Sequence, residues 1–323
     1  MEEPDSAPAL DDQTPEHEHE LRELLHGLSQ PRKWISSIYF YDAEGSWLFD
    51  RITELPEYYP TRTEVSILRD KGAEMARAIG PGAMVIEPGS GAGEKVRLLL
   101  RAFEDPVAYV PIEIAREHLR HSAQALAQDF PQLEVLPVWA DFTRELEIPL
   151  AERRARRRVV YFPGSTLGNF EPDDAVALLR NFADMVGEGG AALIGVDLAK
   201  DAALIDPAYN DSQGVTAAFN RNMLTHLNHR FGADFDPDTF AHRAFYDIAE
   251  ERIEMHLVSQ REQTAHLGGQ AIHFDEGESI HTESSYKYGD ERFAALAEKG
   301  GFRLEKTWKD PEGLFSVRYL ERD

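Results

Sequence analysis

The stretch M-V-I-E-P-G-S-G-A-G-E-K at residues 84–95 combines a short apolar run, a glycine-rich turn and the start of a helical pattern. A strand, a tight turn and a helix N-terminus in this order open the nucleotide- or nucleoside-binding unit of an α/β sheet. Gly89, Gly91 and Gly93 let the backbone turn sharply and approach a ligand without interference from a Cβ atom. A plain strand-to-helix turn explains the same residues, so the neighbouring side chains decide between the possible ligands.

Three classes of ligand use such a turn, and the residues around it favour one of them. A phosphate-binding P-loop requires Gly-Lys followed by Ser or Thr, whereas Glu94 stands between Gly93 and Lys95 here. A dinucleotide would place its pyrophosphate on the helix N-terminus, where Glu94 would repel it. S-Adenosylmethionine has no phosphate and carries a cationic sulfonium, which the acids Glu87 and Glu94 suit better. The turn therefore predicts a site for this methyl donor.

The composition excludes several classes of partner. The 323 residues are 42% hydrophobic and 28% charged, as in an ordinary globular protein. A formal net charge of −24 argues against binding to nucleic acid or to an anionic membrane surface. The absence of cysteine excludes disulfides and thiolate-bound metals. No apolar run approaches the roughly 20 residues of a membrane span, and the acidic start is unlike a signal peptide, so we expect a cytoplasmic protein.

Apolar strands alternate with helices through most of the chain. Residues 1–18, rich in Asp, Glu, Pro and Gln, predict a disordered acidic tail. Residues 19–199 then predict the donor-binding domain, in which Thr61 and Glu64 are spaced as the capping box of a helix. Strands are expected at 107–112, 133–139, 159–162 and 191–196, and a helix at 172–186. Near-continuous apolar strands of this kind indicate a parallel sheet covered on both faces.

The alternation breaks after residue 199. A helical stretch at 215–229 and alternating segments at 252–258 and 270–274 predict an inserted α+β subdomain over residues 200–283, which we expect to bind the substrate. Residues 284–323 return to the sheet with a helix at 290–299 and two strands joined by a tight turn. A Rossmann-like parallel sheet that ends in a C-terminal antiparallel hairpin resembles the α/β fold of class I methyltransferases.

Ligands of an open α/β sheet bind beyond the carboxyl ends of its strands. Glu113 follows one strand about 20 residues beyond the glycine turn, where an acid can accept both ribose hydroxyls, although a surface acid is the alternative. Asp141 and Phe142 follow another strand and fit an adenine site, with a carboxylate for the exocyclic amine and a ring packed on the base. Asp141 as a helix N-cap is an equally good and compatible reading.

The histidines do not predict a metal site. His118 and His121, like His226 and His229, are three residues apart on predicted helices. Neither pair has an adjacent acid that completes a known metal-binding motif, so a solvated helix face explains them better. We therefore predict no catalytic metal.

Five further motifs are more specific than the glycine turn. They are L-P-E-Y-Y-P-T-R-T-E at 55–64, G-S-T-L-G-N at 164–169, G-V-T-A-A-F-N-R-N at 214–222, E-E-R-I-E-M at 250–255 and T-E-S-S-Y-K at 282–287. Together they closely resemble the histidine Nα-methyltransferases of ergothioneine biosynthesis, from about residue 31 to the end. That family converts L-histidine, through its mono- and dimethyl forms, to the trimethyl betaine hercynine, with S-adenosylmethionine as donor and no metal.

The resemblance implies roles for individual residues. The residues that would hold the donor are Tyr41, Gly89, Gly91, Lys95, Glu113, Asp141 and Phe142. The residues that would bind or enclose histidine are Phe49, Tyr58, Gly164, Asn169, Tyr209, Met255, Glu283 and Ser285. Of these sets, Tyr41, Gly164 and Asn169 would lie at the reacting groups. The family usually has Asp at the position of Glu113 and Leu at that of Pro88, and the longer acid should still reach a ribose.

Elementary chemistry is consistent with these roles. Asn169 and Tyr209 can donate hydrogen bonds to the α-carboxylate and so orient the amine. Glu283 and Ser285 can pair with the imidazole, and a wrong side chain would leave a buried acid unpaired. Two alternatives remain: an N-methyltransferase for another amino acid or a protein side chain, and a non-enzymatic nucleoside-binding module. We expect a monomer whose partners are small molecules.

The predicted absence of a metal can be tested directly. We expect methyl transfer to be unaffected by EDTA, because no residue pattern in the chain matches a metal-binding motif. Turnover would be measured with and without chelator. Loss of activity that a divalent cation restores would contradict the prediction.

Overall fold

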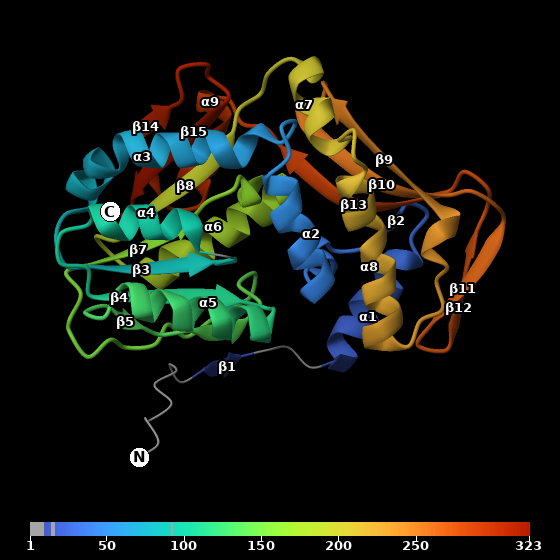
Figure 1. Cartoon of the computed structure of the whole chain (residues 1–323), viewed down its shortest axis with the longest axis horizontal. Helices are drawn as coiled ribbons and strands as arrows, with labels where there is room; N and C mark the ends of the chain where they lie inside the picture. The colour runs from blue at the N-terminus through green and yellow to red at the C-terminus, as the bar shows by residue number, and fades with distance from the viewer. Residues whose placement is uncertain (1–9, 14–16, 92) are drawn as a thin grey trace. The chain divides into compact units, whose positions relative to one another are not determined.

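The structure, a computed structural model, describes residues 10–13, 17–91 and 93–323. These residues cluster into two compact units (Figure 1). The first contains residues 10–13, 62–198 and 288–323, and the second contains residues 17–61 and 199–287. The grouping differs from the expected domains over residues 19–61, because the helices of this segment pack on a long helix of the second unit.

A nine-stranded sheet forms the centre of the first unit. Its strands are β1 (Asp11–Gln13), β3 (Ala83–Pro88), β4 (Ala108–Glu113), β5 (Glu134–Val135), β6 (Val138–Ala140), β7 (Arg157–Phe162), β8 (Ala191–Asp197), β14 (Arg303–Lys309) and β15 (Phe315–Glu321). They follow the order β1-β6-β4-β3-β7-β8-β15-β14, with β5 paired to β4. All pairings are parallel except those of β15, which runs antiparallel to both β8 and β14. The predicted parallel sheet with a C-terminal antiparallel hairpin is confirmed.

Helices cover both faces of this sheet. They are α3 (Tyr59–Ile79), α4 (Glu94–Ala102), α5 (Arg116–Asp129), α6 (Pro172–Val186) and α9 (Asp290–Lys299). Side chains of α3, α4 and α5 share one buried apolar cluster with the sheet, which includes Met75, Leu99 and Tyr319. On the opposite face Phe182 of α6 packs edge-on against Phe162 of β7, and α6 packs on α9. Strand order reverses between β3 and β7, so the ends of these two strands mark the expected ligand site.

Three local predictions were wrong. The helix expected to begin at Thr61 begins at Tyr59, so Glu64 lies inside α3 and not in a capping box. The strand expected at 133–139 is divided into β5 and β6, because Pro137 has no N–H to donate to a neighbouring strand. Within the expected disordered tail, β1 pairs in parallel with β6 and the following helix begins at His17. The rest of that tail, residues 1–9 and 14–16, lies outside the described residues.

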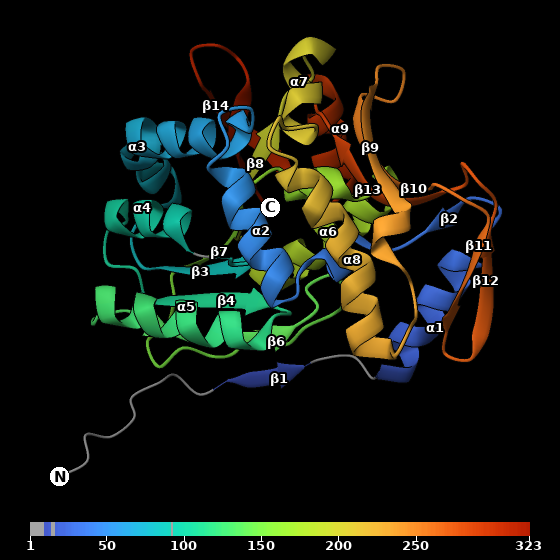
Figure 2. The same cartoon turned by 45° about the vertical axis from the view of Figure 1, so that its right-hand side comes forward.

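The second unit combines a small sheet with helices (Figure 2). Its strands are β2 (Lys33–Trp34), β9 (Phe240–Asp247), β10 (Arg252–Ser259), β11 (Gln263–Leu267), β12 (Gln270–Phe274) and β13 (Ser279–Tyr286). The order β2-β13-β10-β9 forms one sheet, and β11 and β12 form a hairpin. Its helices are α1 (His17–Leu28), η1 (Ser37–Phe40), α2 (Ala43–Thr53), α7 (Ala202–Tyr209), α8 (Val215–Phe231) and η3 (Pro237–Thr239). Helix α8 packs on α2, η1, β9 and β10, and so forms the centre of this unit.

The N-terminus of α8 is held by one carboxylate. Asp211 accepts hydrogen bonds from the backbone N–H groups of Val215 at 2.9 Å and Thr216 at 2.7 Å. Burial would raise the pKa of Asp211, but the N–H donors, led by that of Thr216, outweigh it and hold the pKa below its usual value. The stabilisation is therefore present above the unfolded-state pKa and is lost as the pH falls through the folded-state pKa.

We expect Asp211→Ala to lower the free energy of unfolding by about 1–2 kcal/mol, because it leaves helix N–H groups without an acceptor. Urea denaturation at pH 7 would measure the change. The control is Asp201→Ala, which removes a single exposed cap hydrogen bond to Ala203. An equal or smaller effect at Asp211 would show that this carboxylate does not hold α8.

Candidate active site

The glycine turn after β3 is shaped to receive a ligand. Gly89 and Gly91 have φ angles of +68° and +49°, which L-residues with a side chain rarely adopt. A Cβ atom on Gly89 would lie 3.4 Å from the ring of Phe142, whereas one on Gly91 would have no described atom within 4 Å. Gly93 then caps the N-terminus of α4. The turn thus presents backbone beside an aromatic ring and beside open space, as a nucleoside site requires.

A buried carboxylate connects the turn to the end of β7. Glu64 of α3 is fully buried and accepts hydrogen bonds from Nζ of Lys95 at 2.6 Å and from the backbone N–H of Gly164 at 2.9 Å. A Cβ atom at position 195 of β8 would lie 2.1 Å from Oε1 of Glu64, so only glycine fits there. Lys95 retains further N–H donors beyond the one that Glu64 uses, which suits it to the carboxylate of a bound methionine moiety.

Glu113 is positioned by backbone donors. Its Oε1 accepts from the N–H groups of Ile114 at 2.8 Å and Ala115 at 3.2 Å. Its Oε2 accepts a long hydrogen bond of 3.5 Å from the N–H of Gly91. The acid at the end of β4 therefore lies against the glycine turn, within reach of the same ligand.

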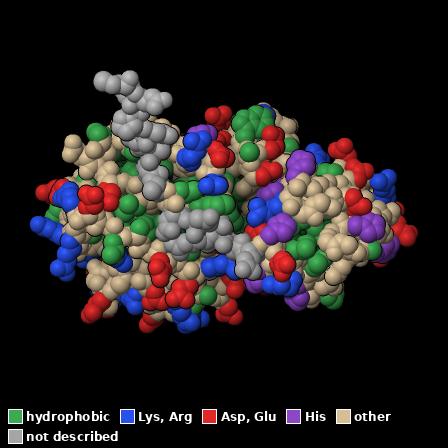
Figure 3. Space-filling view, turned by 90° about the horizontal axis from the view of Figure 1, so that it is seen from below, with side chains coloured by type: hydrophobic (Ala, Val, Ile, Leu, Met, Phe, Trp, Pro, Cys, Tyr) green, Lys and Arg blue, Asp and Glu red, His purple; other side chains and the backbone are tan. Residues whose placement is uncertain are grey.

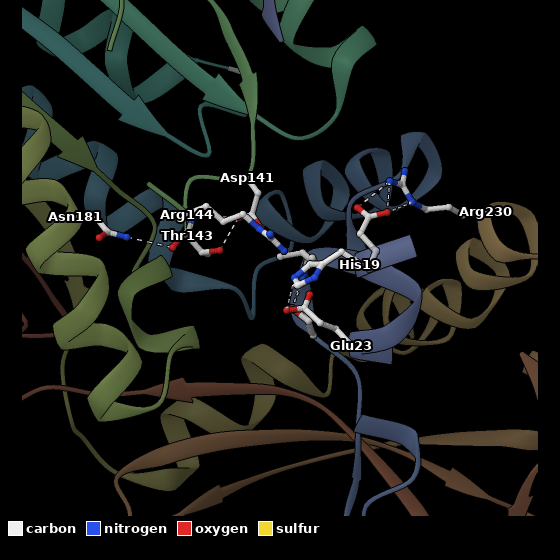
Figure 4. A network of polar contacts seen from close by, with 10 residues as sticks. His19, Glu23, Asp141, Thr143, Arg144, Asn181 and Arg230 are labelled. Atoms are coloured by element: carbon white, nitrogen blue, oxygen red, sulfur yellow. Dashed lines mark hydrogen bonds and ion pairs between the residues drawn. The ribbon is translucent and has the colours of Figure 1, made fainter. Parts of the chain in front are cut away.

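Asp141 and Phe142 follow β6 in a turn. Oδ1 of Asp141 accepts from the backbone N–H of Thr143 at 2.9 Å and from its hydroxyl at 2.7 Å, and Oδ2 accepts from Arg144 at 3.3 Å. Figure 4 shows these side chains together, with Asn181 donating to the Thr143 carbonyl. No helix follows, so the N-cap reading of Asp141 was wrong: its carboxylate closes a turn that carries the ring of Phe142.

Glu87 does not act as the sequence suggested. It is buried in β3, and its carboxyl accepts a hydrogen bond from the hydroxyl of Tyr109. Burial raises the pKa of Glu87 to about 8, so the group is largely uncharged at neutral pH. Its contribution to the preference for a cationic ligand is therefore small.

The turn after β7 holds Gly164 and Asn169. Ser165 has a φ angle of +61°, unusual for a residue other than glycine, and its Oγ accepts from the N–H of Asp197 at 3.0 Å. Asn169 ends the short helix η2 (Thr166–Asn169) that follows. The tight turn brings the backbone N–H of Gly164 to Glu64.

Three predicted aromatic residues of the second unit lie together. The ring centroids of Tyr41 and Phe49 are 5.9 Å apart, and those of Phe49 and Tyr58 are 6.3 Å apart. Phe219 of α8 packs against both Tyr41 and Phe49 at 5.9 Å. Phe49 lies in α2, and its ring packs against both tyrosines.

Met255, Glu283 and Ser285 share one face of the small sheet. Met255 of β10 lies directly opposite Glu283 of β13, and Ile253 lies opposite Ser285. Side chains two residues apart on a strand point to the same face, about 6–7 Å apart. Burial raises the pKa of Glu283 to about 7, and the positive charge of Lys287 opposes that rise. Ser285 is in turn hydrogen-bonded to the hydroxyl of Tyr209 at 2.9 Å.

Comparison with known proteins identifies the family. Residues 20–322 match the model of a family described as histidine-specific, S-adenosylmethionine-dependent methyltransferases. The chain belongs to this family. It is 40% identical over 307 residues to the histidine N-alpha-methyltransferase of Mycolicibacterium smegmatis, which spans 93% of this chain and 94% of that protein. The corresponding enzyme of Mycobacterium tuberculosis is 40% identical over 302 residues, 92% of each chain.

A fungal relative shares the same region. Ergothioneine biosynthesis protein 1 of Neurospora crassa is 30% identical over 309 residues, which span 90% of this chain and 33% of that longer protein. Family membership confirms the enzyme class, the histidine specificity and the methyl donor that the glycine turn and the motifs predicted. The sheet order, parallel with antiparallel C-terminal strands, agrees with the α/β fold expected from the sequence.

The predicted site residues divide between the two units. The first unit contains Gly89, Gly91, Lys95, Glu113, Asp141, Phe142, Gly164 and Asn169. The second contains Tyr41, Phe49, Tyr58, Tyr209, Met255, Glu283 and Ser285. Sequence reasoning missed Glu64, Phe219 and Lys287, although each stands in a motif that carried the resemblance. Glu64 and Lys287 could have been found as charged residues at positions where the sequence pattern predicts burial.

Other classes of site find little support. Among the described residues no group of three or more His, Cys, Asp or Glu side chains could hold a metal ion. No helix in the described part of the chain is long and apolar enough to cross a membrane. On the face drawn in Figure 3 acidic and basic side chains are interspersed, as on an ordinary solvated surface.

We expect Glu64→Gln to weaken donor binding about tenfold or more and to lower the free energy of unfolding by about 3 kcal/mol. The reason is that Lys95 loses a buried charged partner and Gly164 loses its carboxylate acceptor. Calorimetry with S-adenosylhomocysteine and urea denaturation would measure both effects. The control is Asp70→Asn, an exposed acid-to-amide change in the same helix. Donor affinity equal to that of the control would contradict this role of Glu64.

Proposed function

We propose that the enzyme transfers three methyl groups in succession to the α-amino nitrogen of L-histidine and so forms hercynine, as a step of ergothioneine biosynthesis. The names of the relatives with 40% identity over nearly the whole chain support this reaction. The structural observation that carries it is the pair of Glu283 and Ser285 on one face of β13. A carboxylate and a hydroxyl at this spacing match the two nitrogens of an imidazole ring, one a donor and one an acceptor.

This pair would select histidine because another side chain would displace water from Glu283 and Ser285 without replacing its hydrogen bonds. An apolar side chain of similar size would shield the recessed carboxyl group of Glu283 from water and offer no hydrogen bond in return, which costs more than a lost contact. The alternative substrates, a different amino acid or a protein side chain, would be expected to require apolar or differently charged groups at positions 283 and 285. We therefore favour free histidine and its mono- and dimethyl forms.

Methyl transfer requires the enzyme to position the amine and the donor methyl group, and requires little acid–base catalysis. Bound S-adenosylmethionine supplies an electrophilic methyl group, and the amine must be neutral to attack it. The proposed role of Asn169 is to orient the substrate through its carboxylate, with Tyr209 acting at the same site through its hydrogen bond to Ser285, and that of Lys95 and Glu113 is to hold the donor. Tyr41 and Gly164 are proposed to border the reacting nitrogen. Bulk solvent can accept the proton released between transfers.

The test is incubation of the protein with labelled S-adenosylmethionine and each of the twenty amino acids, with products identified by mass. We expect histidine alone to gain three methyl groups. Glu283→Ala should lower kcat/KM for histidine about tenfold or more while S-adenosylhomocysteine binding is retained.

The matched control is Glu262→Ala, which removes an exposed acid in the turn after β10. Wild-type kcat/KM in the Glu283 variant would contradict the imidazole pairing. Methylation of another amino acid in preference to histidine would contradict the proposed substrate.

A further inference from the structure

Lys287, the last residue of the T-E-S-S-Y-K motif, is fully buried. It follows β13, and its backbone N–H donates to the carbonyl of Glu251 at 2.8 Å. An ammonium group is costly to remove from water unless the protein supplies hydrogen-bond acceptors or a negative charge. A lysine in this position therefore needs partners that compensate for its burial.

Two of these partners are side chains already assigned to the histidine site. Nζ of Lys287 donates to Oη of Tyr209 at 3.0 Å and to Oγ of Ser285 at 2.9 Å. The hydroxyl of Tyr209 also donates to Oγ of Ser285 at 2.9 Å. The three polar atoms form a closed triangle, and Nζ lies 5.0 Å from the centre of the Tyr209 ring.

The triangle determines how the two hydroxyl groups can meet a ligand. An ammonium group can only donate, so Lys287 occupies an acceptor position on both oxygens. Ser285 accepts from Tyr209 as well, which uses both lone pairs of Oγ and leaves Ser285 to meet a further group as a donor. Polarisation by the ammonium group also strengthens the hydrogen bond that the hydroxyl of Tyr209 donates to Ser285.

Lys287 acts on Glu283 as well, through its charge. Burial raises the pKa of Glu283 to about 7, and the positive charge of Lys287 is the factor that opposes this rise. The same lysine thus favours the carboxylate form of Glu283, which can only accept hydrogen bonds.

We propose that Lys287 is the positioning residue of the histidine site: through its hydrogen bonds to Ser285 and Tyr209 it makes Ser285 a donor, so that Ser285 and the carboxylate form of Glu283 together match a neutral imidazole ring. The ring's N–H donates to Glu283, and its bare nitrogen accepts from Ser285. An imidazolium, with two N–H donors, would meet the hydroxyl of Ser285 donor to donor. This inference rests on the proposed function, because it assumes that histidine is the substrate.

The experiment compares Lys287→Met with the wild type and with Lys299→Met, an exposed lysine of α9, as control. Histidine affinity and S-adenosylhomocysteine affinity would be measured by calorimetry, and the titration of Glu283 by NMR of ¹³C-labelled carboxyl groups, assigned with Glu283→Gln. We expect Lys287→Met to weaken histidine binding about tenfold or more. Glu283 should titrate at higher pH than in the wild type, with S-adenosylhomocysteine affinity unchanged.

Unchanged histidine affinity, or an unchanged titration of Glu283, would overturn the role of Lys287; the second result is the one expected if the lysine were merely structural. If Lys287→Met does not fold, ¹⁵N NMR of the wild type provides an independent test. We expect the Lys287 side chain to be a protonated, slowly exchanging ammonium at pH 7, and a neutral amine there would overturn the proposal. Failure of the wild type to bind histidine at all would instead contradict the proposed function.

Discussion

The carboxylate of Glu64 is the interaction on which the donor side of the structure depends. It connects α3, the first turns of α4 and the end of β7, because it accepts from Lys95 and from the backbone of Gly164. These segments meet where the strand order of the sheet reverses, which is where an open α/β sheet binds its ligand. Removing a carboxylate from water costs free energy, even when charged and backbone groups donate to it. The hydrogen bonds that it accepts are directional, so they hold the surrounding segments in one geometry.

The second unit also contains a buried charged side chain with hydrogen-bond partners, in this case a cation. Lys287 is a buried cation compensated by two hydroxyl oxygens, and its charge lowers the pKa of the recessed acid Glu283 against the effect of burial. The sheet supplies the register: β10 and β13 are paired so that Met255 faces Glu283 across the strands. A slip of one residue would turn both side chains to the other face, so the many backbone hydrogen bonds of the sheet determine which groups histidine would meet.

Both sites therefore use charged groups buried by their surroundings rather than exposed ones. The pKa values of Glu87 and Glu283 are raised to about 8 and about 7 because each carboxyl is removed from water. In each case a lysine charge opposes the rise, that of Lys95 for Glu87 and that of Lys287 for Glu283, and burial outweighs it. Burial sets the direction of each shift, and the neighbouring group decides how much charge remains for binding.

The amino-acid sequence by itself determined the parallel sheet, the methyl donor and several elements to the residue, such as α6 and α9. Apolar runs, glycine spacing and helix ends are local patterns, so the sequence alone predicts the elements that they define. Only the tertiary structure assigned Glu64 and Lys287, whose partners Gly164 and Tyr209 are 100 and 78 residues away. The role of a buried charged residue depends on the groups that folding brings next to it. No local sequence pattern specifies which groups these are.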